Sequence, residues 1–316
     1  MPASDALAGR RVLVIGATGF LGSHLTRALV DAGADVHALM RVRGRLDRRA
    51  HEHLGDLTDS GTVREALADA RPEVVFHLAA YGTTPAQRDA ARMRAVNVGG
   101  VQHLWACLAH TTARLVQTGT CAEYAPKDGA LCEHDPCRPS SDYAQTMHEA
   151  VLYSLEQGRR AGREVVILRP FGPYGAGDRP ERLIPHVIEG LLGGGRVAVT
   201  AGEQRRDYSH VDDHVRALAA AAIVPLAGTP RVYNIGSGRP IRVRHLVEAV
   251  ADAVGEGSRD RIDYGAVPSR VEDGTDRFAD IAAARRDLGY EPTVGLADGL
   301  ARTVQAARTA REAVPR

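Results

Sequence analysis

A glycine-rich stretch near the N-terminus constrains the fold of this chain more than any other part of its sequence. Residues 11–25 read RVLVIGATGFLGSHL, in which a β-branched apolar run meets glycines at positions 16, 19 and 22. Leucines then recur at helical spacing. Strand, glycine turn and helix in this order predict a phosphate site. The glycines let the backbone approach closely, and the helix N-terminus offers free N–H groups and partial positive charge. We therefore expect a bound dinucleotide here.

Composition and charge exclude several classes of protein. The chain has 316 residues and a formal net charge of +1, so neither a nucleic acid nor an anionic membrane is indicated as a partner. Its apolar runs are too short to cross a bilayer, and residues 1–11 lack the apolar core of a signal peptide. The cysteines at 107, 121, 132 and 137 form no C-x-x-C pair or metal-type spacing with histidine. We expect a cytoplasmic protein with reduced thiols and no metal site.

Strand-like and helical runs alternate through the first half of the chain. The predicted strands cover residues 11–15, 35–40, 73–78, 113–118 and 164–168. The predicted helices cover residues 20–32, 59–69, 87–110 and 142–161. This alternation predicts an α/β fold with a doubly wound parallel sheet and helical crossovers. Ligands bind such sheets at the carboxyl ends of the strands, which is where we expect the functional site.

The pattern becomes irregular after Arg169. Glycine, proline and arginine crowd residues 170–181, and a polar loop is predicted at 202–213. The other predicted elements are helices at 182–192, 243–254, 280–288 and 295–312 and a strand at 231–235. We expect residues 1–169, with about 210–236, to form a cofactor-binding domain, and residues 170–209 and 237–316 to form a smaller α/β substrate lobe.

The ordered motifs resemble those of the extended short-chain dehydrogenase/reductase family, in particular its nucleotide-sugar branch. They are GATGFLGSHL, GDLTD at 55–59, HLAA at 77–80, TGTCAEY at 118–124, EHDPCRPSSDYAQTM at 133–147, LRPFGPYG, LIP, GEQRRDYSHVDD, YNIGSG and RDLGYEP. The resemblance runs from about residue 9 to 305. It implies a Rossmann-like sheet, a nicotinamide cofactor, a nucleotide-diphosphate-sugar substrate and a homodimer formed through the helices near 87–110 and 142–161.

The resemblance also implies which residues contact the cofactor. They are Gly16, Thr18, Gly19, Phe20, Leu21, Gly22, Arg41, Arg43, Asp56, Leu57, Leu78, Ala79, Ala80, Asn97, Tyr143 and Pro170. Members that prefer NAD usually carry an acid at the end of the second strand, where this chain has Met40 followed by arginines. No carboxylate would repel a 2′-phosphate there, and a guanidinium can bind one bidentately. We expect NADP(H) rather than NAD(H).

The catalytic residues implied by the resemblance are Thr120 and Tyr143, with one departure from the family pattern. The family pairs its tyrosine with a lysine four residues later, whose charge stabilises the tyrosinate, but this chain has Met147. Three interpretations are open. Tyr143 acts as an acid while the oxidised nicotinamide ring supplies positive charge, or His148 or an arginine partly replaces the lysine, or the fold persists without activity. Reduction of a carbonyl needs a protonated tyrosine and alcohol oxidation a tyrosinate, so the substitution favours a reductase.

The resemblance places further substrate contacts in the second half. Arg206 and Arg270 stand where relatives clamp the diphosphate, and Leu183 stands where they wall the base. Gly172 replaces an asparagine that relatives often carry. Together with Thr120 and Tyr143 these residues form the predicted substrate site. Hexose 4,6-dehydratases of this branch carry a Thr-Asp-Glu triad, but here Thr120 is followed by cysteine and alanine, which disfavours dehydration.

These observations predict an NADPH-dependent ketoreductase. Its substrate is the C4 keto group of a nucleotide-linked, dTDP-type 4-keto-6-deoxyhexose, with the 6-deoxy part resting on analogy alone. One alternative is a nucleotide-sugar 4-epimerase with a tightly held NAD(P). A second is a catalytically impaired protein that binds dinucleotides or nucleotide sugars. A third is a reductase of other carbonyls, for which Arg206 and Arg270 would be dispensable.

Overall fold

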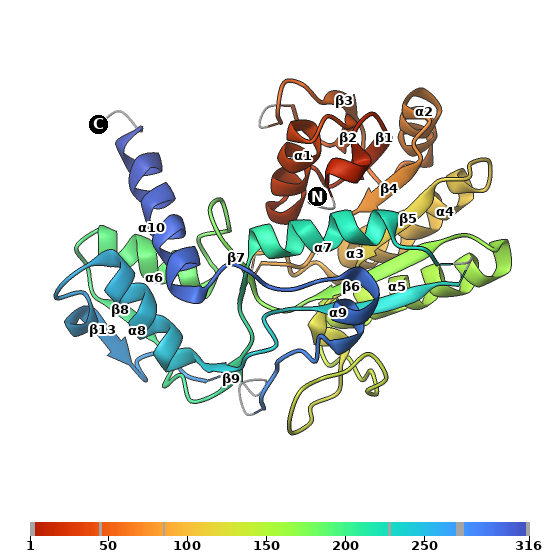
Figure 1. Ribbon diagram of the computed structural model, residues 1–316. Helices are drawn as coiled ribbons and strands as arrows, with labels where there is room; N and C mark the ends of the chain where they lie inside the picture. Colours follow the sequence, from red (N-terminus) through yellow and green to blue (C-terminus); the bar gives the residue numbers. More distant parts are fainter. Residues whose placement is uncertain (1–3, 44–45, 85, 227–228, 270–274, 314–316) are drawn as a thin grey trace.

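The apolar runs of the first half form one parallel sheet. The computed structural model describes residues 4–43, 46–84, 86–226, 229–269 and 275–313. Within these ranges, seven strands pair in the order β11-β6-β5-β4-β1-β2-β3 (Figure 1). Their bounds are β1 Arg11–Ile15, β2 Asp35–Met40, β3 His51–Leu54, β4 Val74–His77, β5 Arg114–Thr118, β6 Val165–Pro170 and β11 Arg231–Ile235. Every neighbouring pair is parallel, which confirms the predicted doubly wound α/β fold.

The strand order reverses between β1 and β4. The chain builds outward from β1 through β2 to β3 and then places β4 on the other side of β1. At the end of β1, Ile15 pairs in register with Leu39 of β2 and His77 of β4. The connections that follow β1 and β4 leave on opposite faces of the sheet. A crevice therefore opens at this edge, the usual ligand site of an open α/β sheet.

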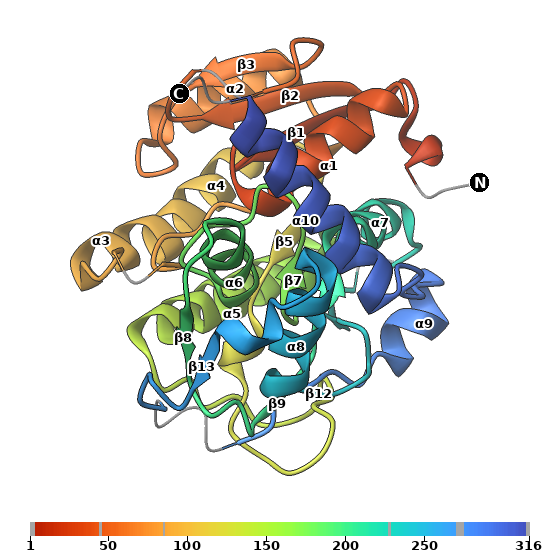
Figure 2. The same ribbon diagram turned by 90° about the vertical axis from the view of Figure 1, so that its left-hand side faces the viewer.

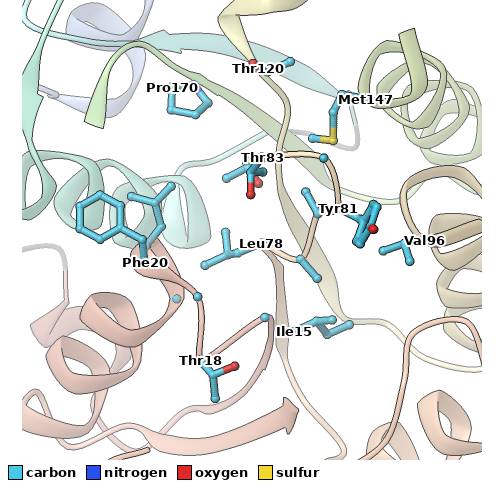
Figure 3. Close-up of a pocket in the computed structure, with 18 of the residues that line it drawn as sticks. Ile15, Thr18, Phe20, Leu78, Tyr81, Thr83, Val96, Thr120, Met147 and Pro170 are labelled. Carbon is cyan, nitrogen blue, oxygen red and sulfur yellow. The ribbon is translucent and has the colours of Figure 1, made fainter. Parts of the chain in front are cut away.

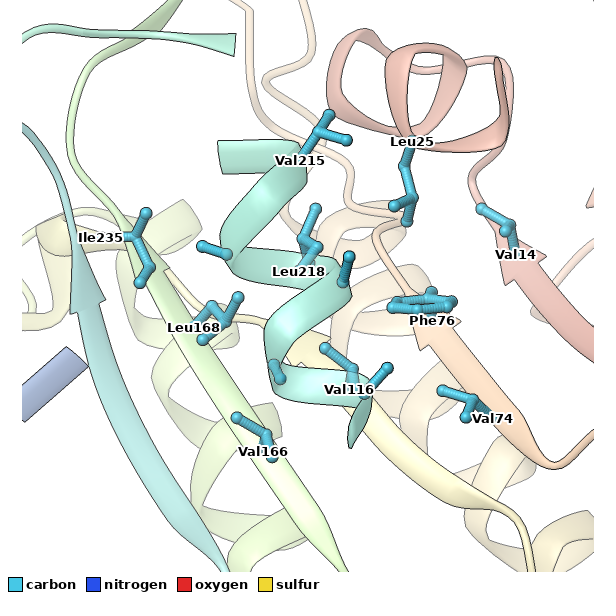
Figure 4. Close-up of a cluster of buried hydrophobic side chains, with 14 of the residues drawn as sticks. Val14, Leu25, Val74, Phe76, Val116, Val166, Leu168, Val215, Leu218 and Ile235 are labelled. Atoms are coloured by element: carbon cyan, nitrogen blue, oxygen red, sulfur yellow. The ribbon is translucent and has the colours of Figure 1, made fainter. Parts of the chain in front are cut away.

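Helices cover both faces because successive strand side chains point to opposite sides. On one face, Val12 and Val14 share a core with α1 and α7. Figure 4 shows α7 lying over the strands that carry Phe76, Val116 and Leu168. On the other face, Leu13 shares a core with α2, α4 and α5. The bounds are α1 Phe20–Asp31, α2 Ser60–Ala70, α4 Gly100–Leu108, α5 Asp142–Ala161 and α7 Val211–Ile223.

A separate apolar core joins the elements at the left of Figure 1. They are α6 Leu183–Leu192, α8 Val243–Val254, α10 Leu296–Glu312, β8 Val197–Val199 and β13 Ile262–Tyr264. The intervening residues 279–290, with α9 Ala282–Leu288, instead pack in the core that holds α7, beside β11. The division into two domains stays a prediction. Residues 279–290, which were assigned to the substrate lobe, pack against the edge of the sheet at β11.

Some elements differ from the sequence-based expectations. The expected loop at 202–213 is wrong in part, since it holds β9 Arg205–Arg206, β10 Ser209–His210 and the first residues of α7. Strand β3 was not expected, because it reads HEHL and is mostly exposed. The alanine-rich helix α7 was not expected either, and it is buried on nearly all sides. The long helix expected at 87–110 is divided into α3 Ala90–Arg94, a π-helical turn η2 Ala95–Gly99 and α4.

The remaining elements are short. They are η1 Asp5–Leu7, η3 Cys121–Glu123, η4 Arg259–Arg261, β7 Pro173–Tyr174 and β12 Ile241–Arg242. Strand β7 pairs with β10, and β12 pairs with β9. Figure 2 shows β2 and β3 at one extreme of the molecule and β8 and β13 toward the other. Among the described residues, no helix is long and apolar enough to cross a membrane.

Candidate active site

A cavity of about 790 Å³ occupies the crevice where the strand order reverses. Its lining comes from the β1–α1 turn, the carboxyl ends of β2 to β5, the start of α5 and the segment after β6. Figure 3 shows Thr18 and Ile15 toward one end of this cavity, Leu78 in the middle, and Thr120 and Met147 toward the other end. The cavity is therefore long and passes both the glycine turn and the predicted catalytic residues.

The glycine turn is packed so closely that two of its glycines are obligatory. Gly16 has φ +90°, and a Cβ there would lie 2.7 Å from the backbone nitrogen of Ala79. A Cβ on Gly22 would lie 2.1 Å from the carbonyl oxygen of Gly16. Gly19 caps α1 without any side-chain hydrogen bond, so the first N–H groups of the helix face the cavity uncapped. This turn fits the phosphates of a dinucleotide.

Most of the residues predicted to contact the cofactor line this cavity. They are Gly16, Thr18, Gly19, Phe20, Leu21, Gly22, Arg41, Asp56, Leu57, Leu78, Ala79, Ala80, Tyr143 and Pro170. The Asp56 carboxylate accepts hydrogen bonds from the backbone N–H and hydroxyl of Thr58, both at 2.9 Å. Burial opposes its ionisation, but these bonds, helped by Arg41, lower the pKa of Asp56. Arg43 is exposed and does not line the cavity.

Asn97 supports the cavity wall instead of lining it. It sits in the π-helical turn η2 and is buried. Its Oδ1 accepts the N–H of Tyr81 at 2.8 Å, and its Nδ2 donates to the Tyr81 carbonyl at 2.9 Å and to the Thr146 hydroxyl at 3.0 Å. The segment after β4 is thereby fixed to α5, the helix that carries Tyr143.

Thr120, Tyr143 and Met147 all line the cavity, so the structure brings the predicted catalytic residues together. Thr120 caps η3, and its Oγ1 accepts the N–H of Ala122 at 3.2 Å. Burial raises the pKa of Tyr143 to about 12, although a hydrogen bond with Thr120 acts in the opposite direction. The phenol therefore keeps its proton at neutral pH. Met147 is buried and places a thioether where the resemblance implies an ammonium group.

His148 does not take the place of the lysine. Its Nδ1 lies 3.1 Å from Oε2 of Glu123, and the ring is not part of the cavity lining. Hydrogen bonding to Cys137 and then to Glu123 raises the pKa of His148 to about 9. Glu123 is fully buried, receives Arg169 Nη2 at 2.8 Å and the N–H of Thr120 at 2.8 Å, and is equally absent from the lining.

The far end of the cavity is basic. Arg179, Arg182 and Arg277 line it. Arg182 acts electrostatically to lower the pKa of Tyr143 and also faces Cys121. Its Nε lies 3.4 Å from Oδ2 of Asp178, a carboxyl whose pKa burial raises. These three arginines were not predicted as site residues. Arginine is so frequent in this chain that a single arginine gives little indication of function.

The other predicted substrate residues are placed less directly. Gly172 lines the cavity with φ +40°, and a Cβ there would meet the Asp207 carbonyl oxygen at 2.1 Å. Leu183 begins α6 and packs toward the third core rather than lining the cavity. Arg206 is not in the lining and donates to the Thr275 carbonyl at 2.6 Å, although its charge reaches Cys121. Arg270 lies outside the described residues.

Known proteins are similar to this chain in both architecture and sequence. Residues 12–236 match the NAD dependent epimerase/dehydratase family. The chain belongs to that family. It is 36% identical over 315 residues to a dTDP-glucose 4,6-dehydratase of Streptomyces griseus, covering 93% of this chain and 92% of that protein.

Solved structures of this family superpose on most of the chain. The UDP-glucose 4-epimerase of Thermotoga maritima with UDP-glucose has a TM-score of 0.87 and 28% identity, covering 95% of this chain and 99% of its own. The dTDP-glucose 4,6-dehydratase of Streptomyces venezuelae with NAD has a TM-score of 0.86 and 29% identity, covering 96% and 98%. The nucleotide-sugar branch identified from the motifs is therefore confirmed.

In this member of the epimerase/dehydratase family, cysteine, alanine and glutamate follow Thr120 after the carboxyl end of β5. Cys121 lines the cavity, and burial raises the pKa of its thiol, so it is neutral. Neither Cys121 nor Ala122 carries a carboxylate, and that of Glu123 is held by Arg169 and His148. The described residues at this position therefore offer no acid to the cavity.

Proposed function

We propose that this protein is an NADPH-dependent ketoreductase that reduces the C4 keto group of a dTDP-linked 4-keto-6-deoxyhexose. The observation that carries the proposal is the environment of Tyr143, which lines the cavity beside Met147 and retains its proton at neutral pH. Relatives in the family are named for dTDP-glucose and UDP-glucose, which supports a nucleotide sugar as the substrate.

The residues divide the work of reduction between them. The glycine turn and the N-terminus of α1 hold the cofactor phosphates, and the bound nicotinamide supplies a hydride. Tyr143 donates its proton to the carbonyl oxygen as that oxygen gains negative charge. The Thr120 hydroxyl hydrogen-bonds the same oxygen and orients it. Met147 places a neutral thioether beside the phenol, so no cation from α5 favours the tyrosinate over the protonated form.

The side chains after Thr120 argue against a dehydratase despite the names of several relatives. Elimination of water needs an acid and a base beside the sugar. Cys121 carries a neutral thiol, Ala122 carries nothing that titrates, and Glu123 is bound to Arg169 in the protein interior. The side chains after Thr120 would therefore not supply the acid and base of a dTDP-glucose 4,6-dehydratase, and Asp178, a carboxyl in the cavity lining, is paired with Arg182.

NADP(H) is proposed over NAD(H) on the lining at the end of β2. Met40 and Arg41 line the cavity there, so a guanidinium and no carboxylate faces the adenosine ribose from that strand. An Arg41→Ala variant is expected to lose the preference for NADPH over NADH, measured as the ratio of kcat/KM values. Equal use of both cofactors by the unaltered protein would refute the preference.

The decisive assay measures loss of NADPH absorbance with a dTDP-4-keto-6-deoxyhexose. We expect oxidation of NADPH by the unaltered protein and none by Tyr143→Phe. NADPH binding by the variant, followed by fluorescence, shows that it is folded. Binding of NADPH without turnover would instead support a protein that has lost catalysis.

The second candidate is a nucleotide-sugar 4-epimerase, favoured by the similarity to the Thermotoga maritima enzyme over 99% of that chain. It predicts NAD(P) already bound in the purified protein and interconversion of UDP-glucose with its C4 epimer without net cofactor consumption. Either observation would displace the reductase.

We also propose a homodimer formed through α4 and α5. Leu104 on α4 and Val151 on α5 are apolar, but both are buried in the core of one chain and are not available for an interface. Leu152 is 52% exposed on α5, which leaves a large apolar side chain for a partner to cover.

A further inference from the structure

Three histidines and two aspartates form a cluster at the outer edge of the sheet. Asp35 and His37 lie on β2, His51 and His53 lie on β3, and Asp69 lies in the last turn of α2. Figure 2 shows β3 as the edge strand beside β2. The cluster sits toward the amino ends of these strands, whereas Met40 and Arg41 reach the active-site cavity at the other end of β2.

Strand geometry gathers these side chains on one face. Residues two apart on a strand point to the same side, so Asp35 and His37 share a face of β2. His37 pairs in register with His51, which places the two imidazoles next to each other. Their ring centroids lie 4.7 Å apart. The backbone that carries the three groups is a paired parallel ladder, which is a rigid support.

The potential ligand atoms converge on one point. Oδ1 of Asp35 lies 3.2 Å from Nε2 of His51 and 3.6 Å from Nε2 of His37. One ligand atom from each of the three residues lies within 4.8 Å of the other two. Ligands of a tetrahedral zinc ion, at about 2.0–2.1 Å from the metal, stand roughly 3.4 Å from one another. Small rotamer adjustments therefore suffice to bind such an ion.

The second ring nitrogen of His37 is also fixed. Nδ1 of His37 lies 2.8 Å from Nε2 of His53, and Nδ1 of His53 lies 3.7 Å from Oδ2 of Asp69. The short contact with His53 holds the His37 ring at Nδ1, and Nε2 of His37 is left on the side of Asp35 and His51.

We propose that Asp35, His37 and His51 bind a divalent transition-metal ion, with Zn²⁺ the best match, and that His53 orients His37. Imidazole and carboxylate ligands suit Zn²⁺, and metal-bound histidines commonly hydrogen-bond through their other nitrogen. The Asp35 and His51 side chains are 40% and 63% exposed, so an ion can enter and water can complete its coordination.

The role of this ion is structural. It joins the edge strand β3 to β2 through side chains, in addition to their backbone hydrogen bonds. We expected no metal site from the sequence. Strand β3 was not predicted, so nothing indicated that the side chains of Asp35, His37 and His51 lie together. The proposal is independent of the proposed reductase activity.

Calorimetric titration of the chelator-treated protein with ZnCl₂ tests the proposal. We expect one zinc ion per chain and a rise in the melting temperature on binding. Asp35→Asn and His51→Ala should abolish both effects, and His53→Ala should weaken binding about 10- to 100-fold. His110→Ala, at an exposed position outside the cluster, is the matched control and should bind normally.

Zinc binding that survives in both Asp35→Asn and His51→Ala would overturn the proposal, as would the absence of binding to the unaltered protein. Loss of binding only in Cys137→Ser would overturn it too, because it would place the ion at Glu123, Cys137 and His148, which also lie close together. A far-ultraviolet circular dichroism spectrum like that of the unaltered protein shows that each variant is folded, whatever cofactor the protein binds.

Discussion

The Nδ1 atom of His148 lies 3.1 Å from Oε2 of Glu123, and neither side chain lines the cavity that Met147 and Tyr143 share. The imidazole that follows Met147 in the sequence is thus paired with the buried carboxylate of Glu123, which Arg169 also binds. His148 therefore does not replace the family lysine. An arginine is the other substitute considered, and Arg182 is a cation, among the residues that the structure describes, that acts on Tyr143.

The pH dependence of reduction tests Tyr143 as the proton donor. Because burial raises the pKa of Tyr143 to about 12, the protonated form predominates throughout the neutral range. We expect kcat/KM to be constant between about pH 6 and 10 and to fall only in stronger alkali. A rate that falls on acidification through neutrality would contradict this role.

Restoring the lysine should move that profile. In Met147→Lys, the ammonium one helical turn from Tyr143 stabilises the tyrosinate and lowers its pKa. The alkaline fall in kcat/KM for reduction then begins at lower pH, because the tyrosinate fraction at a given pH rises as the pKa of Tyr143 falls. Met147→Leu is the matched control and should keep the original profile. Identical profiles for the lysine and leucine variants would show that position 147 does not govern the tyrosine.

Arg182 should contribute to substrate binding as well as to the field at Tyr143. Removing its charge in Arg182→Gln is expected to raise KM for a dTDP-sugar about tenfold, the cost of one charge-assisted hydrogen bond. Arg138→Gln, at an exposed position outside the cavity, is the control. Steady-state kinetics with NADPH at saturation separate KM from kcat. An unchanged KM would exclude Arg182 from the substrate site.

The buried Glu123 ion pair should make stability depend on pH in two ranges. The pKa of Glu123 is lowered in the fold, so its contribution is present above its unfolded pKa and is lost in acid. The pKa of His148 is raised to about 9, so its contribution is complete below its unfolded value and is lost as pH rises toward 9. We expect the melting temperature to decline over this alkaline range.

Glu123→Gln should reduce that alkaline decline, because Glu123 is, after Cys137, the group that raises the pKa of His148. It should also cost about 3–5 kcal/mol, because Arg169 is left buried without its counterion. Thermal melts from about pH 6.5 to about pH 9.5 cover the pKa of His148 in the unfolded and in the folded state. They measure both the alkaline decline and the loss of stability. His134→Gln, which alters an exposed histidine, should behave like the unaltered protein. A decline of unchanged size in Glu123→Gln would assign it to another group.

Gly22 offers a steric test of the phosphate site. An alanine there would drive its Cβ to 2.1 Å from the Gly16 carbonyl oxygen, so the turn must open. We expect Gly22→Ala to lose NADPH binding and to melt at lower temperature. Gly99→Ala meets no atom closer than 4.0 Å and is the matched control. Normal binding by Gly22→Ala would mean that the turn does not receive the phosphates.

Strands of the sheet that contain an apolar run were predictable from the sequence. The bounds of β1, β2 and β11 match those expected. Helix α5 was predicted equally well, because its amphipathic pattern runs its full length and Gly162 ends it in the left-handed region. Strand β3 was not predicted, because it has no apolar run, and helix α7 was not predicted, because it begins in a polar stretch that favours a loop and continues as a run of buried alanines. Prediction from a pattern needs a contrast between buried and exposed positions, and both elements lack it.

The candidate site was predictable where the backbone itself fixes it. Gly16 and Gly22 carry a steric signal that is visible in the sequence as a glycine spacing. Asn97 was assigned to the cofactor by resemblance, yet its hydrogen bonds go to Tyr81 and Thr146. Arg182 gave no signal, because its electrostatic effect on Tyr143, which is distant in the sequence, exists only once the chain is folded.

The hydrogen bonds of Asn97 have a consequence for motion. They tie the segment after β4 to α5, so this side of the cavity and the helix that carries Tyr143 are held together. We expect a change in the width of the cavity to come from the part of the lining that includes Gly172, Arg179 and Arg182. Ligand entry and release would then depend on that part of the lining, while Tyr143 keeps its position relative to the segment after β4.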